Sequence, residues 1–181
     1  MGHRLKGFIE NNKDEIIKKW FEATLQTYAP DTAKFYKGQK DQFANPVGNI
    51  NAKGVAFLLD QLLNDFEADA VKTYLDPIIR IRAVQDFTPS QATAFILSLK
   101  KILWDCLSDK LQNAAMVLEL LAFESRIDKL CLMAFDIYMA CKEKIYQISA
   151  NDMRSQALKA FKRAGLIVDE PPPGKIKGLN H

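Results

Sequence analysis

The segment between Leu111 and Ser149 carries the most regular apolar pattern in the chain. Its apolar residues recur at alternating spacings of four and three: Met116, Leu120, Phe123, Ile127, Leu130, Ala134, Ile137 and Cys141. No proline or glycine interrupts the segment, so it predicts one helix of roughly 35 residues, about 50 Å long. A helix this long outreaches a compact domain. We therefore expect it to cross the domain and also to use part of this stripe to pair with a second copy of the chain.

The other segments also have helical spacing, and an all-α fold is expected. Asn45-Pro46 and Asp76-Pro77 each fit a cap followed by a first-turn proline, so each predicts a helix start. Strand signals such as a sustained alternation of apolar and polar residues are almost absent. The predicted helices cover residues 12–28, 33–43, 47–66, 78–85, 88–107, 111–149 and 151–164, the last one ending at Gly165.

The stretch RIRAVQDFTPSQATAFILSLKK, residues 80–101, contains a helix end, a turn and a helix start. Thr88 suits an N-cap, Pro89 the first helical position and Gln91 the third. The Thr88 hydroxyl and the Gln91 amide can then satisfy each other's free backbone N–H groups, which is the capping box.

Composition limits the class of protein. The 181 residues suit one domain, predicted over 1–168, followed by a tail at 169–181 that has too few apolar residues to fold. The net charge of +3 is too small to indicate nucleic-acid binding. The longest uncharged run has roughly 13 residues, short of the ~20 that a membrane span needs. Since no signal-peptide pattern opens the chain either, we expect a cytoplasmic protein.

The histidines argue against most catalytic chemistry. The only two, His3 and His181, stand at the two ends of the chain. A general base, a zinc site or a haem ligand usually draws on a histidine inside the folded body. Phosphate-loop, dinucleotide and nucleophile-elbow motifs are absent. We expect no cofactor, no metal and no enzyme; a hydrolase that uses carboxylates alone is the one class left open.

Two arginines remain as candidate ligand residues. Arg80 and Arg82 are two residues apart, so on a helix they point about 200° away from each other. One interpretation is a structural ion pair for one of them and solvent exposure for the other. The alternative is that one of them, together with Gln85, lines a pocket for an anionic or polar ligand.

The chain resembles the N-terminal domain of the RsbT co-antagonist protein RsbRD. The resemblance rests on residues 80–101, on Asp14-Glu15-Ile16-Ile17 with Trp20, and on the corner at residues 43–48, and it covers about residues 12–149. It implies an all-helical, globin-like sensory domain that has lost haem and has no catalytic residues. The positions that match the family's pattern are Arg80, Arg82, Gln85, Asp86, Thr88, Pro89 and Gln91.

In larger members of this family such a domain precedes a STAS domain, the partner-binding module of a stressosome-type relay. No STAS-like segment follows Gly165 here. The resemblance therefore implies a sensory or regulatory domain in stress-response signal transduction, here without the STAS output domain. We expect it to form a homodimer with protein partners of stressosome or STAS type and an unspecified small ligand. The alternative is a helical carrier for a small molecule or lipid, which the 11 phenylalanines would allow.

Overall fold

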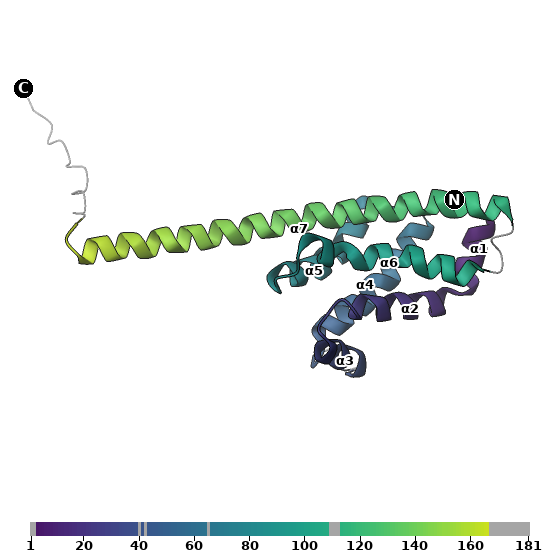
Figure 1. The fold of residues 1–181 in the computed structure, drawn as a ribbon, viewed down its shortest axis with the longest axis horizontal. Helices are drawn as coiled ribbons and strands as arrows, with labels where there is room; N and C mark the ends of the chain where they lie inside the picture. The colour runs from purple at the N-terminus through teal and green to yellow at the C-terminus, as the bar shows by residue number, and fades with distance from the viewer. Residues whose placement is uncertain (1–2, 40, 42, 65, 109–112, 167–181) are drawn as a thin grey trace, which may run out of the picture. The chain divides into compact units, whose positions relative to one another are not determined.

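The computed structural model describes residues 3–39, 41, 43–64, 66–108 and 113–166, and within these ranges it contains helices and no strand (Figure 1). The helices are α1 (His3–Asn11), α2 (Lys13–Leu25), α3 (Pro30–Gly38), α4 (Pro46–Leu63), α5 (Ala68–Val84), α6 (Pro89–Leu107) and α7 (Ala114–Arg163). The predicted all-α class is confirmed, including the long helix in the C-terminal half. The globin-like topology stays a prediction. Among the described helices none is both long and apolar enough to cross a membrane.

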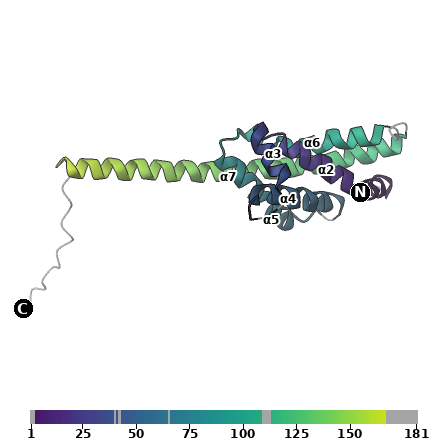
Figure 2. The same ribbon diagram turned by 90° about the horizontal axis from the view of Figure 1, so that it is seen from below.

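The chain divides into two compact units, residues 1–142 and residues 143–181. In the first unit α4 packs mainly on α5, and α2 packs on α6 and α4. Figures 1 and 2 both show α6 lying beside the N-terminal half of α7. The described part of the second unit is the remainder of α7 and its end at Leu166. The predicted domain boundary after residue 168, and the tail beyond it, lie outside the described residues.

The apolar stripe of α7 is part of the core of the first unit. Seven of its residues are buried: Met116, Leu120, Phe123, Ile127, Leu130, Ala134 and Ile137. The eighth, Cys141, is half-buried and packs against the same cluster. Helices α1, α2, α4, α5 and α6 supply the other side of this cluster. The residues predicted to pair with a second copy are therefore covered by the chain's own helices.

Two polar side chains of α7 also cap the ends of other helices. The Glu119 carboxylate accepts a hydrogen bond from the backbone N–H of Leu5 at 2.8 Å, in the first turn of α1. Arg126 donates to the carbonyl oxygens of Leu62 and Asn64 at 2.7 and 2.8 Å, at the end of α4. Each charge has the sign that stabilises the helix terminus it meets. Helix α7 thus fixes where α1 begins and where α4 ends.

Helices α4 and α5 approach closely at Gly54. A Cβ atom at this position would lie 2.4 Å from Cδ1 of Ile78, closer than two carbon atoms can pack. Gly54 therefore lets Ile78 lie directly on the α4 backbone. Trp20 links α2 to α6, because its indole N–H donates to the Phe95 carbonyl oxygen at 2.7 Å.

The predicted helix start at Asp76-Pro77 is wrong. Pro77 lies inside α5, which begins at Ala68. A proline in a helix removes one backbone hydrogen bond, but Val71 and Leu75 extend the buried face of α5 upstream of it. Their burial favours one continuous helix over a break at Pro77. Asp76 does not cap a helix and instead forms an ion pair with Arg80, one turn later.

Three other helix predictions differ from the structure. The helix predicted over residues 33–43 lies at Pro30–Gly38, because Pro30 stands in its first turn. Helix α1 was not predicted, because Leu5 and Ile9 are its only buried residues and give too short a pattern. The break expected between residues 149 and 151 does not occur, and α7 continues to Arg163. Its predicted stop is confirmed: Gly165 has φ 68°, and the N–H of Leu166 bonds back to the Phe161 carbonyl oxygen at 3.0 Å.

The capping box at the start of α6 is present as predicted. The Thr88 hydroxyl accepts from the Gln91 N–H at 3.3 Å, and the Gln91 side chain accepts from the Thr88 N–H at 2.9 Å. We expect Thr88→Ala to lower the free energy of unfolding by about 1 kcal/mol, measured by urea denaturation. Thr73→Ala is the matched control, because the Thr73 hydroxyl only bonds the Asp69 carbonyl within α5. Equal losses in the two variants would contradict a capping role for Thr88.

Candidate functional site

The turn between α5 and α6 places Arg80 and Arg82 in opposite environments. Arg80 is exposed and pairs with Asp76 on its own helix. This hydrogen bond raises the pKa of Arg80. Arg82 has no solvent-exposed surface and points into the first unit. The expected divergence of the two side chains is thus seen, and Arg82 is the one that faces inward.

The Arg82 guanidinium lies among three helices and three aromatic rings. It donates to the carbonyl oxygen of Thr24 at 3.3 Å and, at a longer 3.4 Å, to that of Gln91. Its central carbon lies 4.6 to 5.2 Å from three ring centroids, those of Tyr28, Phe87 and Phe95. The rings cover the faces of the planar group, as in other cation–π contacts. We call Arg82 and these three aromatic residues the Arg82 cage.

No carboxylate of the described residues forms an ion pair with Arg82, and its Nε has no hydrogen-bond partner. Burial lowers the pKa of Arg82, and the facing Tyr28 only partly offsets this. The folded state therefore holds the proton less tightly than the unfolded chain does. The charge consequently opposes folding at every pH below the pKa of Arg82 in the folded state.

A second buried polar atom without a partner belongs to a residue that also neighbours Tyr28. It is Oδ1 of Asn51, on α4. The Asn51 amide nitrogen is 3.5 Å from the Tyr28 hydroxyl oxygen. Buried polar atoms are nearly always hydrogen-bonded. The two exceptions among the described side chains, Arg82 and Asn51, thus flank the same tyrosine.

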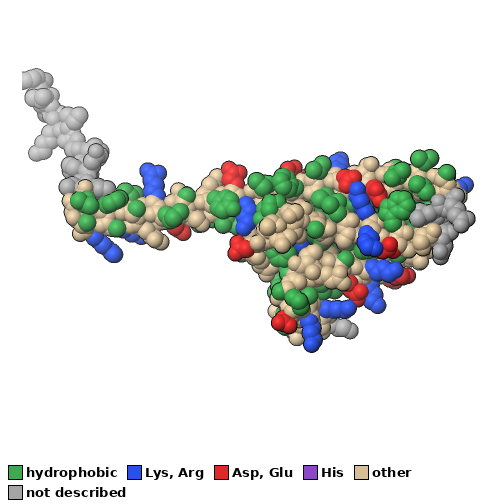
Figure 3. Space-filling model, viewed as in Figure 1, with side chains coloured by type: hydrophobic (Ala, Val, Ile, Leu, Met, Phe, Trp, Pro, Cys, Tyr) green, Lys and Arg blue, Asp and Glu red, His purple; other side chains and the backbone are tan. Residues whose placement is uncertain are grey.

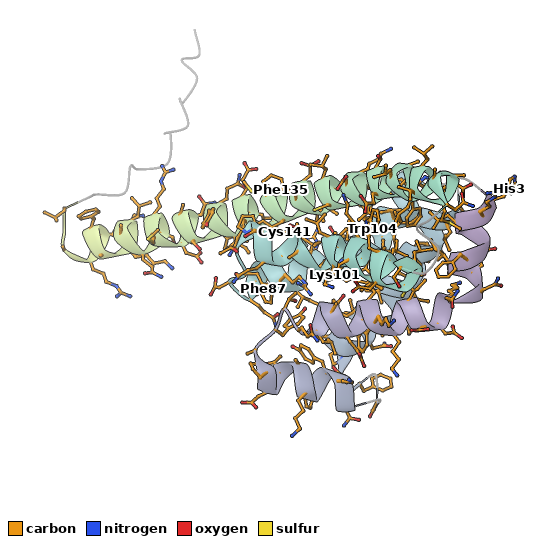
Figure 4. The ribbon with its side chains drawn as sticks, turned by 45° about the vertical axis from the view of Figure 1, so that its right-hand side comes forward. His3, Phe87, Lys101, Trp104, Phe135 and Cys141 are labelled. Carbon is orange, nitrogen blue, oxygen red and sulfur yellow. The ribbon has the colours of Figure 1, made fainter. Side chains whose placement is uncertain are left out.

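The α5–α6 turn is tied to α7 at two points. The Tyr138 hydroxyl donates to the Phe87 carbonyl oxygen, and the Lys142 ammonium lies 3.5 Å from the Asp86 carboxylate. Asp86 has φ 60°, a left-handed conformation that is uncommon outside glycine. Because the Asp86 side chain is 97% exposed, its ion pair is weak. Tyr138 is therefore the main link between this turn and α7; Figure 4 labels Phe87 below this part of α7.

The other residues predicted as ligand-binding or family-signature positions do not face the surroundings of Arg82. Gln85, Asp86, Thr88 and Gln91 are all exposed. Gln91 reaches Arg82 only through its backbone carbonyl, and its side chain serves the capping box. Of the residues that complete the cage, Phe87 lies in the α5–α6 turn, Phe95 lies on α6, and Tyr28 follows the end of α2. Tyr28 is the one far from residues 80–91 in sequence, and no local signal in the sequence indicated it.

A cleft of about 480 Å³ lies elsewhere in the first unit. Its lining residues are His3, Lys6, Gly7, Glu10, Leu63, Asn64 and Arg126. Arg126 already binds the carbonyl groups at the end of α4. Lys6 donates to the Asn64 side chain at 2.8 Å. The cations of the cleft thus have structural partners, so it is a weaker candidate than the Arg82 cage.

The cysteines do not assemble a reactive site. All three are free and half-buried. Burial raises the pKa of the Cys131 and Cys141 thiols, which disfavours the reactive thiolate at neutral pH. The part of the chain that the structure describes contains no group of three or more potential metal ligands.

Replacing Arg82 tests whether its charge serves stability. We expect Arg82→Met to leave the free energy of unfolding within about 1 kcal/mol of wild type or to raise it, because methionine fills similar space without an unpaired buried charge. Arg82→Ala should lower it by ~2–4 kcal/mol, because it leaves a cavity. Chemical denaturation measures both variants. If Arg82→Met lost as much as Arg82→Ala, the charge itself would be structural.

Comparison with known proteins identifies the family of the chain. Among curated proteins and solved structures, no significant match to the chain was found. A family model described as the RsbT co-antagonist protein rsbRD N-terminal domain matches residues 14–153. The match spans α2 to α6 and most of α7, and it includes every residue of the Arg82 cage. The chain therefore belongs to the RsbRD N-terminal domain family.

Proposed function

We propose that this chain is a non-catalytic sensory domain of the stressosome type, in which the α5–α6 turn passes a signal to α7. The observation that supports it is the contact between the Phe87 carbonyl and the Tyr138 hydroxyl. Phe87 covers Arg82 on one side and is held by α7 on the other. A change at the buried arginine would therefore reach α7 through one residue.

Family membership supports this function more strongly than it supports the carrier hypothesis. The domain name refers to co-antagonism of RsbT, which is a regulatory role. A lipid carrier would need an apolar cavity, whereas the cleft described above is lined mainly by polar and charged residues. We infer that the partners are proteins of a stressosome-type relay, either a STAS-domain protein or a switch kinase such as RsbT.

We also propose that the domain forms a homodimer through the outer face of α7. The exposed large apolar residues on this face of the first unit are Leu118, Leu121, Leu132, Phe135 and Met139. Hydrophobic side chains are visible along the α7 edge of the molecule in Figure 3. A solvated helix face normally carries mostly polar residues.

The spacing of this outer face favours a second copy of the chain as its partner. Leu118, Leu132, Met139, Tyr146 and Met153 are all separated by multiples of seven residues in the sequence. A repeat of seven is the pattern of a helix that packs along a similar helix over many turns. The inner stripe of α7 has the same type of spacing but is covered within the chain, so the outer face is the one available for pairing.

Substitution on the outer face should dissociate the dimer. We expect Leu132→Glu to weaken self-association by at least ~tenfold, a loss of about 1.4 kcal/mol, because it places a charge in an apolar interface. Sedimentation equilibrium measures the change. Val84→Glu is the control: Val84 is 70% exposed, similar to Leu132 at 67%, but lies on α5. A wild-type chain that stays monomeric at its highest soluble concentration would exclude this dimer.

Removing the Tyr138 hydroxyl should loosen the link to α7. Tyr138→Phe keeps the buried ring and deletes one hydrogen bond worth about 1 kcal/mol. We expect amide exchange at residues 85–89 and 134–142 to rise by roughly fivefold, measured by hydrogen–deuterium exchange. Tyr74→Phe is the matched control, because Tyr74 lies on α5, is 39% exposed and is not part of the proposed dimer face.

The same pair of variants tests the signalling role. Titration against a purified STAS-domain protein and a switch kinase from the same genome should show binding by the wild type. Tyr138→Phe should change that affinity, and Tyr74→Phe should not. Absence of binding to both partners would remove the stressosome role. Binding that is equal in the two variants would remove the Phe87–Tyr138 link as the route.

A further inference from the structure

We propose that the Arg82 cage is a binding site for a small monocarboxylate, whose entry displaces Phe87. This inference deepens the proposed function by naming the class of ligand that the sensory domain detects. It rests on three features of the cage. Arg82 is a buried cation without a paired anion among the described residues, its Nε has no hydrogen-bond partner, and Phe87, which covers it, lies in a turn and not in a helix.

The charge of the site indicates a single negative charge. Arg82 is fully buried, and no described carboxylate pairs with it. A buried arginine stays protonated at neutral pH. One monovalent anion would neutralise the site, whereas a dianion would leave one buried negative charge uncompensated.

The geometry of the guanidinium indicates a planar ligand. Three rings stand over its faces at 4.6 to 5.2 Å, so a ligand can approach only in the plane of the group. The two terminal nitrogens each donate to one carbonyl oxygen, and Nε donates to none. Nε therefore has an unpaired N–H, and the terminal nitrogen next to it would direct an N–H to the ligand in place of its long carbonyl bond of 3.3 to 3.4 Å. A carboxylate matches this pair with both of its oxygens.

The surroundings indicate a ligand with a small apolar part. Tyr28, Phe87 and Phe95 would contact the carbon atoms next to the carboxylate. The Asn51 side-chain oxygen has no hydrogen-bond partner and its amide lies 3.5 Å from the Tyr28 hydroxyl, so the oxygen would accept a bond from a rearranged Tyr28 hydroxyl. In the bound state Nε of Arg82 would then bond the carboxylate, and Oδ1 of Asn51 would bond the Tyr28 hydroxyl.

Phe87 is the residue best placed to move. It is half-buried and lies on the α5–α6 turn, whereas Tyr28 and Phe95 lie on or next to packed helices and are nearly or fully buried. Asp86, directly before it, holds an uncommon left-handed conformation. Because the Tyr138 hydroxyl bonds the backbone carbonyl of Phe87, a displacement of Phe87 that moves the backbone of the turn would break this bond. Ligand entry and release of α7 would therefore be one event.

The test measures binding of acetate, propionate and benzoate at constant ionic strength, with chloride as the balancing anion. Titration followed by the fluorescence of Trp20, which bonds to the Phe95 carbonyl, and by calorimetry should detect at least one carboxylate. Propionamide, which has similar shape but no charge, should not bind. Arg82→Met should weaken binding by at least ~tenfold. Arg80→Gln, on the same helix but exposed, should change it less than twofold.

Two outcomes would overturn the proposal. One is that no carboxylate of the panel binds more tightly than chloride. The other is that a carboxylate binds equally well to wild type and Arg82→Met, with both shown to be folded by circular dichroism. As an independent check that keeps Arg82, Phe87→Ala should speed carboxylate association, because it removes the cover.

The proposed ligand class and the proposed signalling role can be excluded independently of each other. If propionate binds but amide exchange at residues 134–142 does not change, the binding site is supported and the proposed signal route from Phe87 to α7 is excluded. If no carboxylate binds while Tyr138→Phe alters partner affinity, the sensory function stands and this ligand class is excluded.

Discussion

The fold depends on the burial of one face of α7. Side chains such as Leu120, Phe123, Ile127 and Leu130 have essentially no exposed surface. Each contributes about 1.5–3 kcal/mol when fully buried, so together they are comparable with the ~5–15 kcal/mol that stabilises a whole domain. Without this face, α1 and α4 would also lose the side chains that cap their ends.

Arg82 is the exception to this apolar core. Its two carbonyl hydrogen bonds contribute at most about 1.5–3 kcal/mol each, and each ring adds about 0.5–2 kcal/mol. Burying an unpaired cation costs several kcal/mol. These terms roughly cancel, so stability alone gives little reason for arginine over methionine at this position. A role that uses the charge explains the residue better, and the turn that covers it holds Asp86 in the left-handed conformation.

Sequence reasoning succeeded where the signal was local and failed where packing decides. Thr88 and Gln91 form the predicted capping box, because a box needs only residues three apart. Asp76-Pro77 has the same local signal as a helix start, yet the upstream apolar residues Val71 and Leu75 continue the helix through it. For the two arginines, the helix period predicts opposite directions. It does not predict that Arg82 is the buried one, since that depends on which face of α5 meets α2 and α6.

The inner apolar stripe of α7 likewise shows that spacing predicts a buried face but not the partner that buries it. Spacings of four and three predict a buried helix face whether the partner is the same chain or another one. The inner stripe proved to be intramolecular, so the outer face is the one left for the proposed pairing. Beyond Lys142 all described side chains except that of Ile145 are exposed, including Tyr146, Met153 and Phe161. A free segment of this length would be only partly helical in water, but extending an existing helix needs no new nucleus. The helicity of residues 143–163 therefore derives from the packed part of α7, and pairing with a second copy would add the burial that this segment lacks on its own.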